Sequence, residues 1–247
     1  MTSLDWCLRL EHRGWAELFS EGRWGRFRID PRGVNGSDLV FLTGWDAGSI
    51  SAVEGAIQLG GSPRIVSPQG LLERVGASRP EDDSGDAVPL DGLLVAWLPA
   101  SAPTRVSVRP RGFLRRGRAL TGSGPARRGP TTIEPAILEL TFPWGDRLLH
   151  LGSSIHRTTS PAWLDSVVER FHGPRWVIVG APYGEEEALA PALLRLEPEI
   201  VLLTDLDRKE RALRGHPTQL LTPTVDQLCE HGLSVHPFAS GATYRFE

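Results

Sequence analysis

Apolar residues in the first third of the chain fall in short, partly alternating runs, which is the pattern of strands half buried in a sheet. Strands are predicted at Trp6–Leu10, Trp15–Phe19 and Trp24–Ile29, separated by Gly or charged turns. Asp30-Pro31 ends the third strand. The next apolar run, Asp38–Thr43, favours a buried strand.

A helical period follows this strand. Ile50, Val53 and Ile57 recur on one face of a predicted helix over Ser49–Leu59, with Ser49 as its N-cap. Further short elements are then expected, and they are a strand at Arg64–Ser67, a helix at Gln69–Val75 and a strand at Leu93–Leu98.

The last hundred residues alternate between strand and helix patterns. A hairpin is predicted from strands Ile133–Phe142 and Arg147–Leu151 around the turn Pro143-Trp144-Gly145-Asp146. The predicted helices are Pro161–Phe171 with Ser160 as N-cap, Glu185–Leu196 with an acidic first turn, and Pro223–His231 with Thr222 as N-cap. The predicted strands are Trp176–Val179, Ile200–Leu203, Ser234–His236 and Thr243–Phe246. This order predicts an α/β protein with two sheets covered by helices.

The length, net charge, cysteine count and missing motifs of the chain exclude several classes of protein. A length of 247 residues fits one α/β domain or two small ones, and the net charge of −3 favours neither nucleic acid nor an anionic membrane. Two cysteines, Cys7 and Cys229, exclude a disulfide framework or a Cys-rich metal site. No signal-peptide core and no apolar run of about 20 residues is present, so we expect a cytoplasmic protein without a membrane span. The usual nucleotide-binding, zincin and esterase motifs are also absent.

One segment departs from this near-neutral balance. Residues 92–133 contain no Asp or Glu, and their eight arginines leave the rest of the chain with a net charge of −11. Those arginines are Arg105, Arg109, Arg111, Arg115, Arg116, Arg118, Arg127 and Arg128. We interpret residues 103–132 as an Arg-rich loop insertion. Guanidinium groups suit phosphates, carboxylates and acidic protein surfaces, so a protein or phosphate-bearing partner is favoured over DNA. The alternative is a solvated loop in an Arg-biased protein.

Several segments together resemble the metallo-β-lactamase superfamily. In GRFRIDPRGVNGSDLVFLTGWDAGSIS (Gly25–Ser51), a strand ends in Ile-Asp-Pro and a later strand reads Asp-Leu-Val, as in that family before its Thr-His-x-His-x-Asp-His signature. Asp146–Ser154, Val177–Gly184 and Ile200–Asp205 are similar to its later strands. The nearest branch is the ascorbate-lactonase-like hydrolases. The resemblance implies a single domain over residues 1–247, an αββα sandwich of two mixed sheets with helices outside, and a metal centre at one edge.

The same resemblance implies that the metal ligands are missing. The signature ligands fall on Gly44, Asp46, Gly48 and Ser49, and the following family histidine falls near residues 98–102. The bridging aspartate becomes Ser153 and the final histidine becomes Asp205. Only Asp46 and Asp205 could still bind a metal well, whereas catalytic zinc needs three protein ligands and an open water position. The expected protein therefore has no metal and no cofactor.

Other chemistry-bearing residues have alternative interpretations. His150 and His156 flank residues 152–154 and could form a relocated metal site or a Ser–His pair, or could be a strand and a loop histidine that face different ways. Trp45 could fill or stack a ligand in the vacated pocket, or be a buried aromatic. Asp46 and Asp205 could hold a hard cation, or be hydrogen-bonded loop carboxylates, which we favour.

Three functions remain open at this point. The first is a catalytically degenerate protein that binds or scaffolds a larger complex through Trp45 and the Arg-rich loop. The second is a metal-dependent hydrolase with a rebuilt site. The third is a nucleic-acid-binding module that uses the arginines. The missing ligands favour the first and make an enzyme the less favoured expectation.

Overall fold

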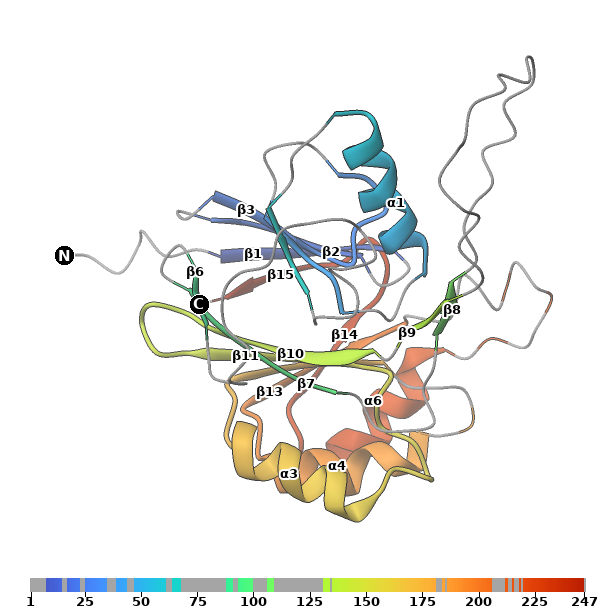
Figure 1. Cartoon of the computed structure of the whole chain (residues 1–247). Coiled ribbons are helices and arrows are strands. Elements are labelled where there is room, and N and C mark those ends of the chain that lie inside the picture. Colours follow the sequence, from blue (N-terminus) through green and yellow to red (C-terminus); the bar gives the residue numbers. More distant parts are fainter. Residues whose placement is uncertain are drawn as a thin grey trace.

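In the computed structural model, two large β-sheets pack face to face with helices on both outer sides (Figure 1). The structure describes residues 8–14, 17–22, 25–34, 39–43, 47–60, 64–67, 88–90, 93–99, 106–108, 131–133, 135–180, 184, 186–205, 212, 215, 218 and 220–246. The predicted helix at Gln69–Val75 lies outside these residues.

The first sheet has six strands in the spatial order β15-β1-β2-β3-β4-β5. Their bounds are β1 Leu8–Gly14, β2 Glu17–Gly22, β3 Gly25–Ile29, β4 Leu39–Phe41, β5 Arg64–Val66 and β15 Thr243–Phe246. The pairs β3–β4 and β4–β5 are parallel, and the others are antiparallel. The first sheet is therefore mixed, as predicted.

The second sheet has seven strands in the order β14-β13-β12-β11-β10-β7-β6. Their bounds are β6 Val88–Leu90, β7 Leu93–Pro99, β10 Ala136–Thr141, β11 Arg147–Gly152, β12 Trp176–Gly180, β13 Ile200–Thr204 and β14 Val235–Phe238. Strands β11 to β14 are parallel to one another, whereas β10, β7 and β6 pair antiparallel.

Helices cover the outer faces of both sheets. Helix α1 (Ala47–Gln58) lies on the first sheet, and α3 (Pro161–Phe171), α4 (Leu189–Leu196) and α6 (Leu221–Glu230) lie on the second (Figure 1). The indole N–H of Trp163 in α3 donates a hydrogen bond to the carbonyl of Pro99 at 2.8 Å, which holds α3 against the end of β7. The layers are thus the predicted αββα sandwich.

Two apolar cores follow from the alternation of side chains along the central strands. In β11, Leu148 faces the other sheet, while Leu149 and Leu151 face the helices. The core between the sheets contains Phe41, Phe142 and Trp176, each 1–2% exposed. Because β12 and β13 are covered on both faces, their sequences are nearly continuous apolar runs.

Several predicted helix ends are wrong by two or more residues. Helix α1 begins at Ala47, so Ser49 is a buried residue of its first turn rather than the N-cap. Helix α6 begins at Leu221 after Leu220, so Thr222 is not its N-cap. The predicted helix Glu185–Leu196 is a 3₁₀ turn, η2 (Glu186–Ala188), followed by α4. Proline inside a first turn misled the prediction for α6, because the first N–H groups of a helix need no helical acceptor and Pro223 fits there.

Some predicted strand bounds also need correction. The residues at 11–13 lie within β1, where Glu11 pairs with both β2 and β15 and His12 pairs with β2, before a register irregularity between His12 and Gly14. The predicted strand Ile133–Phe142 is interrupted before Ala136, since Pro135 has no N–H to donate to a ladder. The short strand β9 (Thr131–Ile133) instead pairs with β8 (Val106–Val108) in a separate two-stranded sheet.

This small sheet lies at the ends of the predicted insertion at about residues 103–132. The pairing of Val106 with Ile133 and of Val108 with Thr131 brings the ends of the Arg-rich segment together. The loop insertion between these two strands stays a prediction. Residues 109–130 lie outside the described residues.

Candidate functional site

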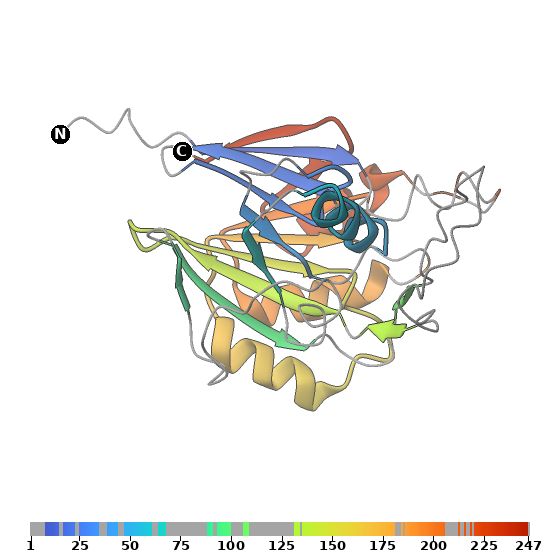
Figure 2. The same cartoon turned by 45° about the horizontal axis from the view of Figure 1, so that its top comes forward.

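The carboxyl ends of the parallel strands meet at one edge of the sandwich. Strands β11, β12 and β13 end there, and the hairpin between β10 and β11 lies at the opposite edge, on the left of Figure 1. Strands β8 and β9 lie at the same edge as these carboxyl ends, on the right of Figures 1 and 2. The residues matched to the family's metal ligands come from segments that end at this edge. We call this edge the candidate site.

A backbone contact joins the two sheets at the candidate site. The amide of Ala136, at the start of β10, donates to the carbonyl of Thr43 at 2.7 Å, just after β4. Because β10 runs antiparallel to β11, the start of β10 lies beside the end of β11. The segment after β4 and the segment after β11 are thus brought to the same place, as the resemblance implies.

The segment after β4 is anchored by a buried aspartate. Asp30 is 0% exposed, and its Oδ1 accepts the amide N–H of Thr43 at 2.8 Å. The hydroxyl of Thr43 donates to the other carboxylate oxygen. Asp30 has φ of 46°, a left-handed conformation that Asp tolerates better than most residues. These bonds fix the point from which the chain enters the signature positions.

Two signature positions lie in the first turn of α1. Gly48 belongs to the helix and has no side chain to coordinate a metal. Ser49 is 0% exposed, so its hydroxyl is enclosed by protein. Gly44, Trp45 and Asp46 lie outside the described residues, and so do Arg105, Arg109, Arg111, Arg115, Arg116 and Arg118.

The segment after β11 carries the next matched position. Ser153 is half-buried and follows Gly152, whose φ of 56° turns the chain at the strand end. Ser154 is 0% exposed, and its hydroxyl oxygen has no hydrogen-bond partner in this structure. Thr159 closes this loop, since its Oγ1 accepts the amide of His156 at 2.8 Å and donates to the carbonyl of Ser154 at 3.2 Å.

The last matched position is Asp205, which directly follows β13. It is half-buried, and its Oδ1 accepts the amide N–H of Ser240 at 3.0 Å. Ser240 lies in the turn between β14 and β15, where the chain passes from the second sheet to the first. Asp205 is therefore a loop carboxylate that accepts a backbone hydrogen bond across the sheet edge.

The two histidines near the candidate site differ in environment. His150 is 1% exposed in β11, paired in register with Leu138 and Ile178, and shares the face that these two residues turn toward the other sheet. His156 is half-buried in the loop that follows the strand. Among the residues that the structure describes, no group of three or more His, Cys, Asp or Glu side chains could hold a metal ion.

The described residues do not fit the metal centre that the fold implies. Gly48 offers no donor, and serine is a poor zinc ligand beside neutral histidine. Asp205 has one carboxylate oxygen bonded to Ser240. One carboxylate does not supply the three protein ligands of a catalytic zinc site. We derive no chemical step through a metal.

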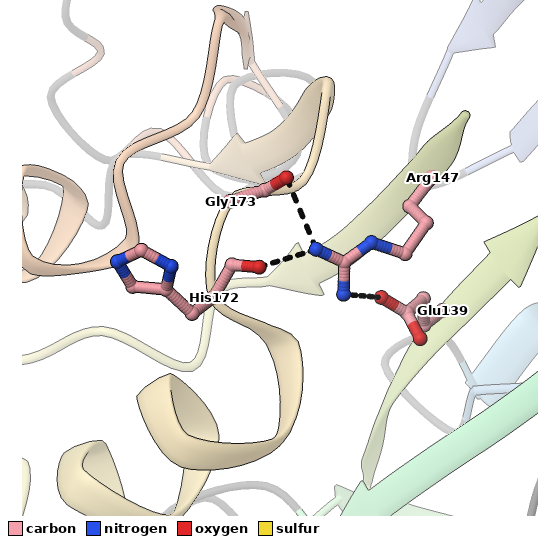
Figure 3. A network of polar contacts seen from close by, with 4 residues as sticks. All are labelled: Glu139, Arg147, His172 and Gly173. Carbon is pink, nitrogen blue, oxygen red and sulfur yellow. Dashed lines mark hydrogen bonds and ion pairs between the residues drawn. The ribbon is translucent and has the colours of Figure 1, made fainter. Parts of the chain in front are cut away.

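A second polar network lies at the opposite edge of the second sheet. The guanidinium of Arg147 donates to Glu139 at 3.3 Å, to the carbonyl of Gly173 at 3.1 Å and to the carbonyl of His172 (Figure 3). Burial raises the pKa of the Glu139 carboxyl above its ordinary value of 4.5, while Arg147 and Arg170 lower it. Because Arg147 caps carbonyls at the end of α3, we assign this network a structural role.

Sequence reasoning missed the two partners that define the candidate site. The Asp in Ile-Asp-Pro was interpreted as the end of a strand, although an Asp between a strand and a proline is also a common hydrogen-bond acceptor. The side chain of Ser240 gives no sequence signal for this contact, because its backbone amide makes the hydrogen bond.

None of the described helices is long and apolar enough to cross a membrane.

Comparisons with solved structures identify the fold. Igni18, a novel metallo hydrolase from the hyperthermophilic archaeon Ignicoccus hospitalis, matches with a TM-score of 0.65 and 17% identity over 98% of this chain and 99% of that chain. The isothiocyanate hydrolase from Delia radicum gut bacteria matches with a TM-score of 0.57 and 15% identity over 97% and 99%. A candidate metal-dependent hydrolase from Parabacteroides distasonis matches with a TM-score of 0.59 and 13% identity over 93% and 92%. No protein-family model and no curated protein matches the sequence. The chain has the predicted metallo-β-lactamase-type fold, which is shared here with metal-dependent hydrolases.

Proposed function

We propose that this protein is a catalytically degenerate metallo-β-lactamase-fold protein that acts in the cytoplasm as a binding or scaffolding subunit. The observation that carries the proposal is the chemistry of the matched ligand positions at the candidate site. They hold Gly48 without a side chain, Ser49 enclosed in α1, Ser153, and Asp205 bonded to a backbone amide. A hydrophobic pattern kept over the whole fold, with these ligands replaced, favours a retained structural role.

Without the usual metal-ligating side chains, the metal-bound water that serves as nucleophile in such hydrolases would also be missing. Hydrolases of this kind activate water by coordinating it to a metal, which lowers the pKa of the water to about 7. Serine and glycine cannot hold such an ion, and among the residues that the structure describes no group of three or more His, Cys, Asp or Glu side chains could hold one. Binding a partner without catalysing a reaction is therefore the function that we favour for the candidate site.

The Arg-rich segment is the surface that we propose for the partner. It begins with Arg105 directly before β8, leaves the described fold after β8 and returns at β9, and β8 contacts α1 at the candidate site (Figure 1). Arg105, Arg109, Arg111, Arg115, Arg116 and Arg118 give this segment a positive charge without acidic neighbours. An acidic protein surface is the favoured partner, and a phosphate-bearing ligand is the alternative.

The proposal is tested on protein purified without chelator. We expect less than 0.1 zinc, manganese or iron per chain (about one-tenth of a site) and no turnover in an esterase, lactonase and phosphodiesterase screen. Asp46→Ala should leave both results unchanged. Stoichiometric metal with turnover that Asp46→Ala abolishes would instead establish the second candidate, a metal-dependent hydrolase with a rebuilt site. That candidate is favoured by one observation, the likeness of the fold to metal-dependent hydrolases.

Partner binding is tested by co-purification from the native host. We expect a specific protein partner whose capture is lost when Arg115, Arg116 and Arg118 become Ala, and retained when Arg170 of α3 becomes Ala. Nucleic-acid binding is a separate outcome of this test. It would appear as a mobility shift that weakens steeply with salt and requires the same three arginines.

A further inference from the structure

We infer that Asp205 is a structural latch that closes the candidate site by protein contacts, in the place where the resemblance puts a metal ligand. The inference deepens the proposed function and rests on it, because a latch at this position takes over the cross-linking that a metal would provide. It concerns the stability of the edge, so it is tested by measurements that do not depend on activity.

The position of Asp205 in the topology carries the argument. Asp205 directly follows β13, an inner strand of the second sheet, and Ser240 lies in the turn after β14. That turn leads directly into β15, which pairs with β1 in the other sheet. The 3.0 Å bond from the Ser240 amide to Asp205 Oδ1 therefore ties an inner strand to the point where the chain changes sheets.

The turn itself is well defined and brings the two sheets together. The amide of Ala242 donates to the carbonyl of Ala239 at 2.8 Å, and Gly241 has φ of 93°, which favours glycine. Beyond the turn, the rings of His236 in β14 and Tyr244 in β15 meet edge to face with centroids 5.6 Å apart. These contacts fix the backbone that presents the Ser240 amide to the carboxylate.

The chemistry of the bond separates a latch from a metal ligand. The latch needs an accepting oxygen at the Oδ1 position and no negative charge, so asparagine can replace aspartate. A metal ligand at this position needs the anionic oxygen, because the amide oxygen of asparagine binds zinc poorly. Ser240 contributes only its backbone amide, so side-chain substitution at residue 240 would not test the bond.

The experiment compares the full-length protein with Asp205→Ala, Asp205→Asn and the control Asp226→Ala, an exposed aspartate on α6. Each protein is studied with EDTA and with equimolar zinc. Three quantities are measured: the Tm, the hydrogen-exchange rate of the Ser240 amide and the zinc bound by calorimetry.

A latch predicts that Asp205→Ala lowers the Tm by about 3–10 °C and exposes the Ser240 amide to exchange at least about tenfold faster. Asp205→Asn should stay within about 2 °C of the unmodified protein and keep the amide protected, as should Asp226→Ala. EDTA and zinc should change none of these values. If Asp205→Ala fails to fold, the Tm and the Ser240 exchange rate of Asp205→Asn still distinguish a latch from a metal ligand.

Two results would overturn the inference. One is an unchanged Tm and unchanged Ser240 exchange in Asp205→Ala. The other is a zinc-dependent rise in Tm that Asp205→Asn abolishes, which would make Asp205 a metal ligand. The proposed function fails separately, through metal-dependent turnover, and it stands if the latch alone is refuted.

Discussion

The carboxylate of Asp30 accepts hydrogen bonds from both the backbone amide and the side-chain hydroxyl of Thr43. Both residues are buried, at 0% and 2% exposure. The carbonyl of Thr43 in turn accepts the amide of Ala136 from the second sheet. A single aspartate at the end of β3 thus orients the residue through which the two sheets are joined at the candidate site.

Asp30→Ala is expected to destabilise the protein by about 2–4 kcal/mol, because it leaves the amide and hydroxyl of Thr43 buried without an acceptor. Urea unfolding followed by tryptophan fluorescence measures the loss. Thr43→Ser keeps the hydroxyl and should cost less than about 1.5 kcal/mol, mainly from the missing methyl group.

The coupling between the two residues provides the control. In a double-mutant cycle of Asp30→Ala and Thr43→Val, the two losses should fall short of additivity by about 1–3 kcal/mol, because they remove the same contact. Additive losses would show that Asp30 acts through some other residue.

Arg147→Met is expected to cost about 3–5 kcal/mol, because it leaves the Glu139 carboxylate buried without its ion-pair partner and removes a cap from the end of α3. Chemical denaturation at neutral pH measures the effect. Arg195→Met is the matched control on α4, where the ion pair with Asp165 is exposed and should contribute less than about 1 kcal/mol.

Glu139 should make the stability depend on pH in an unusual direction. Burial raises the pKa of its carboxyl in the folded state above 4.5, while Arg147 and Arg170 oppose the rise. At pH values between the ordinary and the raised pKa, the folded state therefore holds a proton that the unfolded state has already lost. Stability from this group is present below the ordinary pKa and is lost as the pH rises through the raised pKa.

The matching measurement is the free energy of unfolding of the unmodified protein and Glu139→Gln from pH 4 to pH 7. Relative to Glu139→Gln, the unmodified protein should become less stable as the pH rises through this range. A difference that stays flat, or that changes in the opposite direction, would show that burial does not raise the pKa of this carboxyl.

The fold was largely predictable because its apolar patterns are strong. Strands β12 and β13 are buried on both faces, so their continuous apolar runs could be assigned with nearly correct bounds. Helix starts were harder to assign. Ser49 and Thr222 resemble N-caps, but both helices begin about one half-turn earlier, at Ala47 and Leu221.

The candidate site was predictable in its location but not in its contacts. Resemblance placed Ser153 and Asp205 at one edge, and the parallel order of β11, β12 and β13 does bring them there. The partners of Asp30 and Asp205 are mainly backbone amides distant in the sequence. Every residue has such an amide, so no composition or motif can indicate which one is bound.

Substitution by alanine should change the stability in opposite directions at two glycines that have space for a Cβ atom. A Cβ at Gly55 or at Gly145 would meet no atom within 4 Å. Gly55 lies inside α1, where alanine should stabilise the protein by about 0.5–1 kcal/mol. Gly145 has φ of 94° in the β10–β11 turn, so alanine should cost about 1–3 kcal/mol. Thermal unfolding of both variants checks the signs, and equal effects would contradict this assignment of backbone strain.

Placing the family's ligand at two matched positions, histidine at Ser49 and aspartate at Ser153, tests whether the candidate site can still accept a metal ligand. Ser49 is 0% exposed within α1, so Ser49→His must force an imidazole into packed protein and should cost about 1–3 kcal/mol. Ser153 is half-buried in the turn after β11, and Ser153→Asp should cost less than about 1 kcal/mol. Urea unfolding with and without equimolar zinc measures both effects. Because one added ligand together with Asp205 is fewer than the three protein ligands of a catalytic zinc site, zinc should stabilise neither variant. A Ser49→His protein that folds stably and gains stability with zinc would contradict this prediction and would show that the edge can still hold a metal ion.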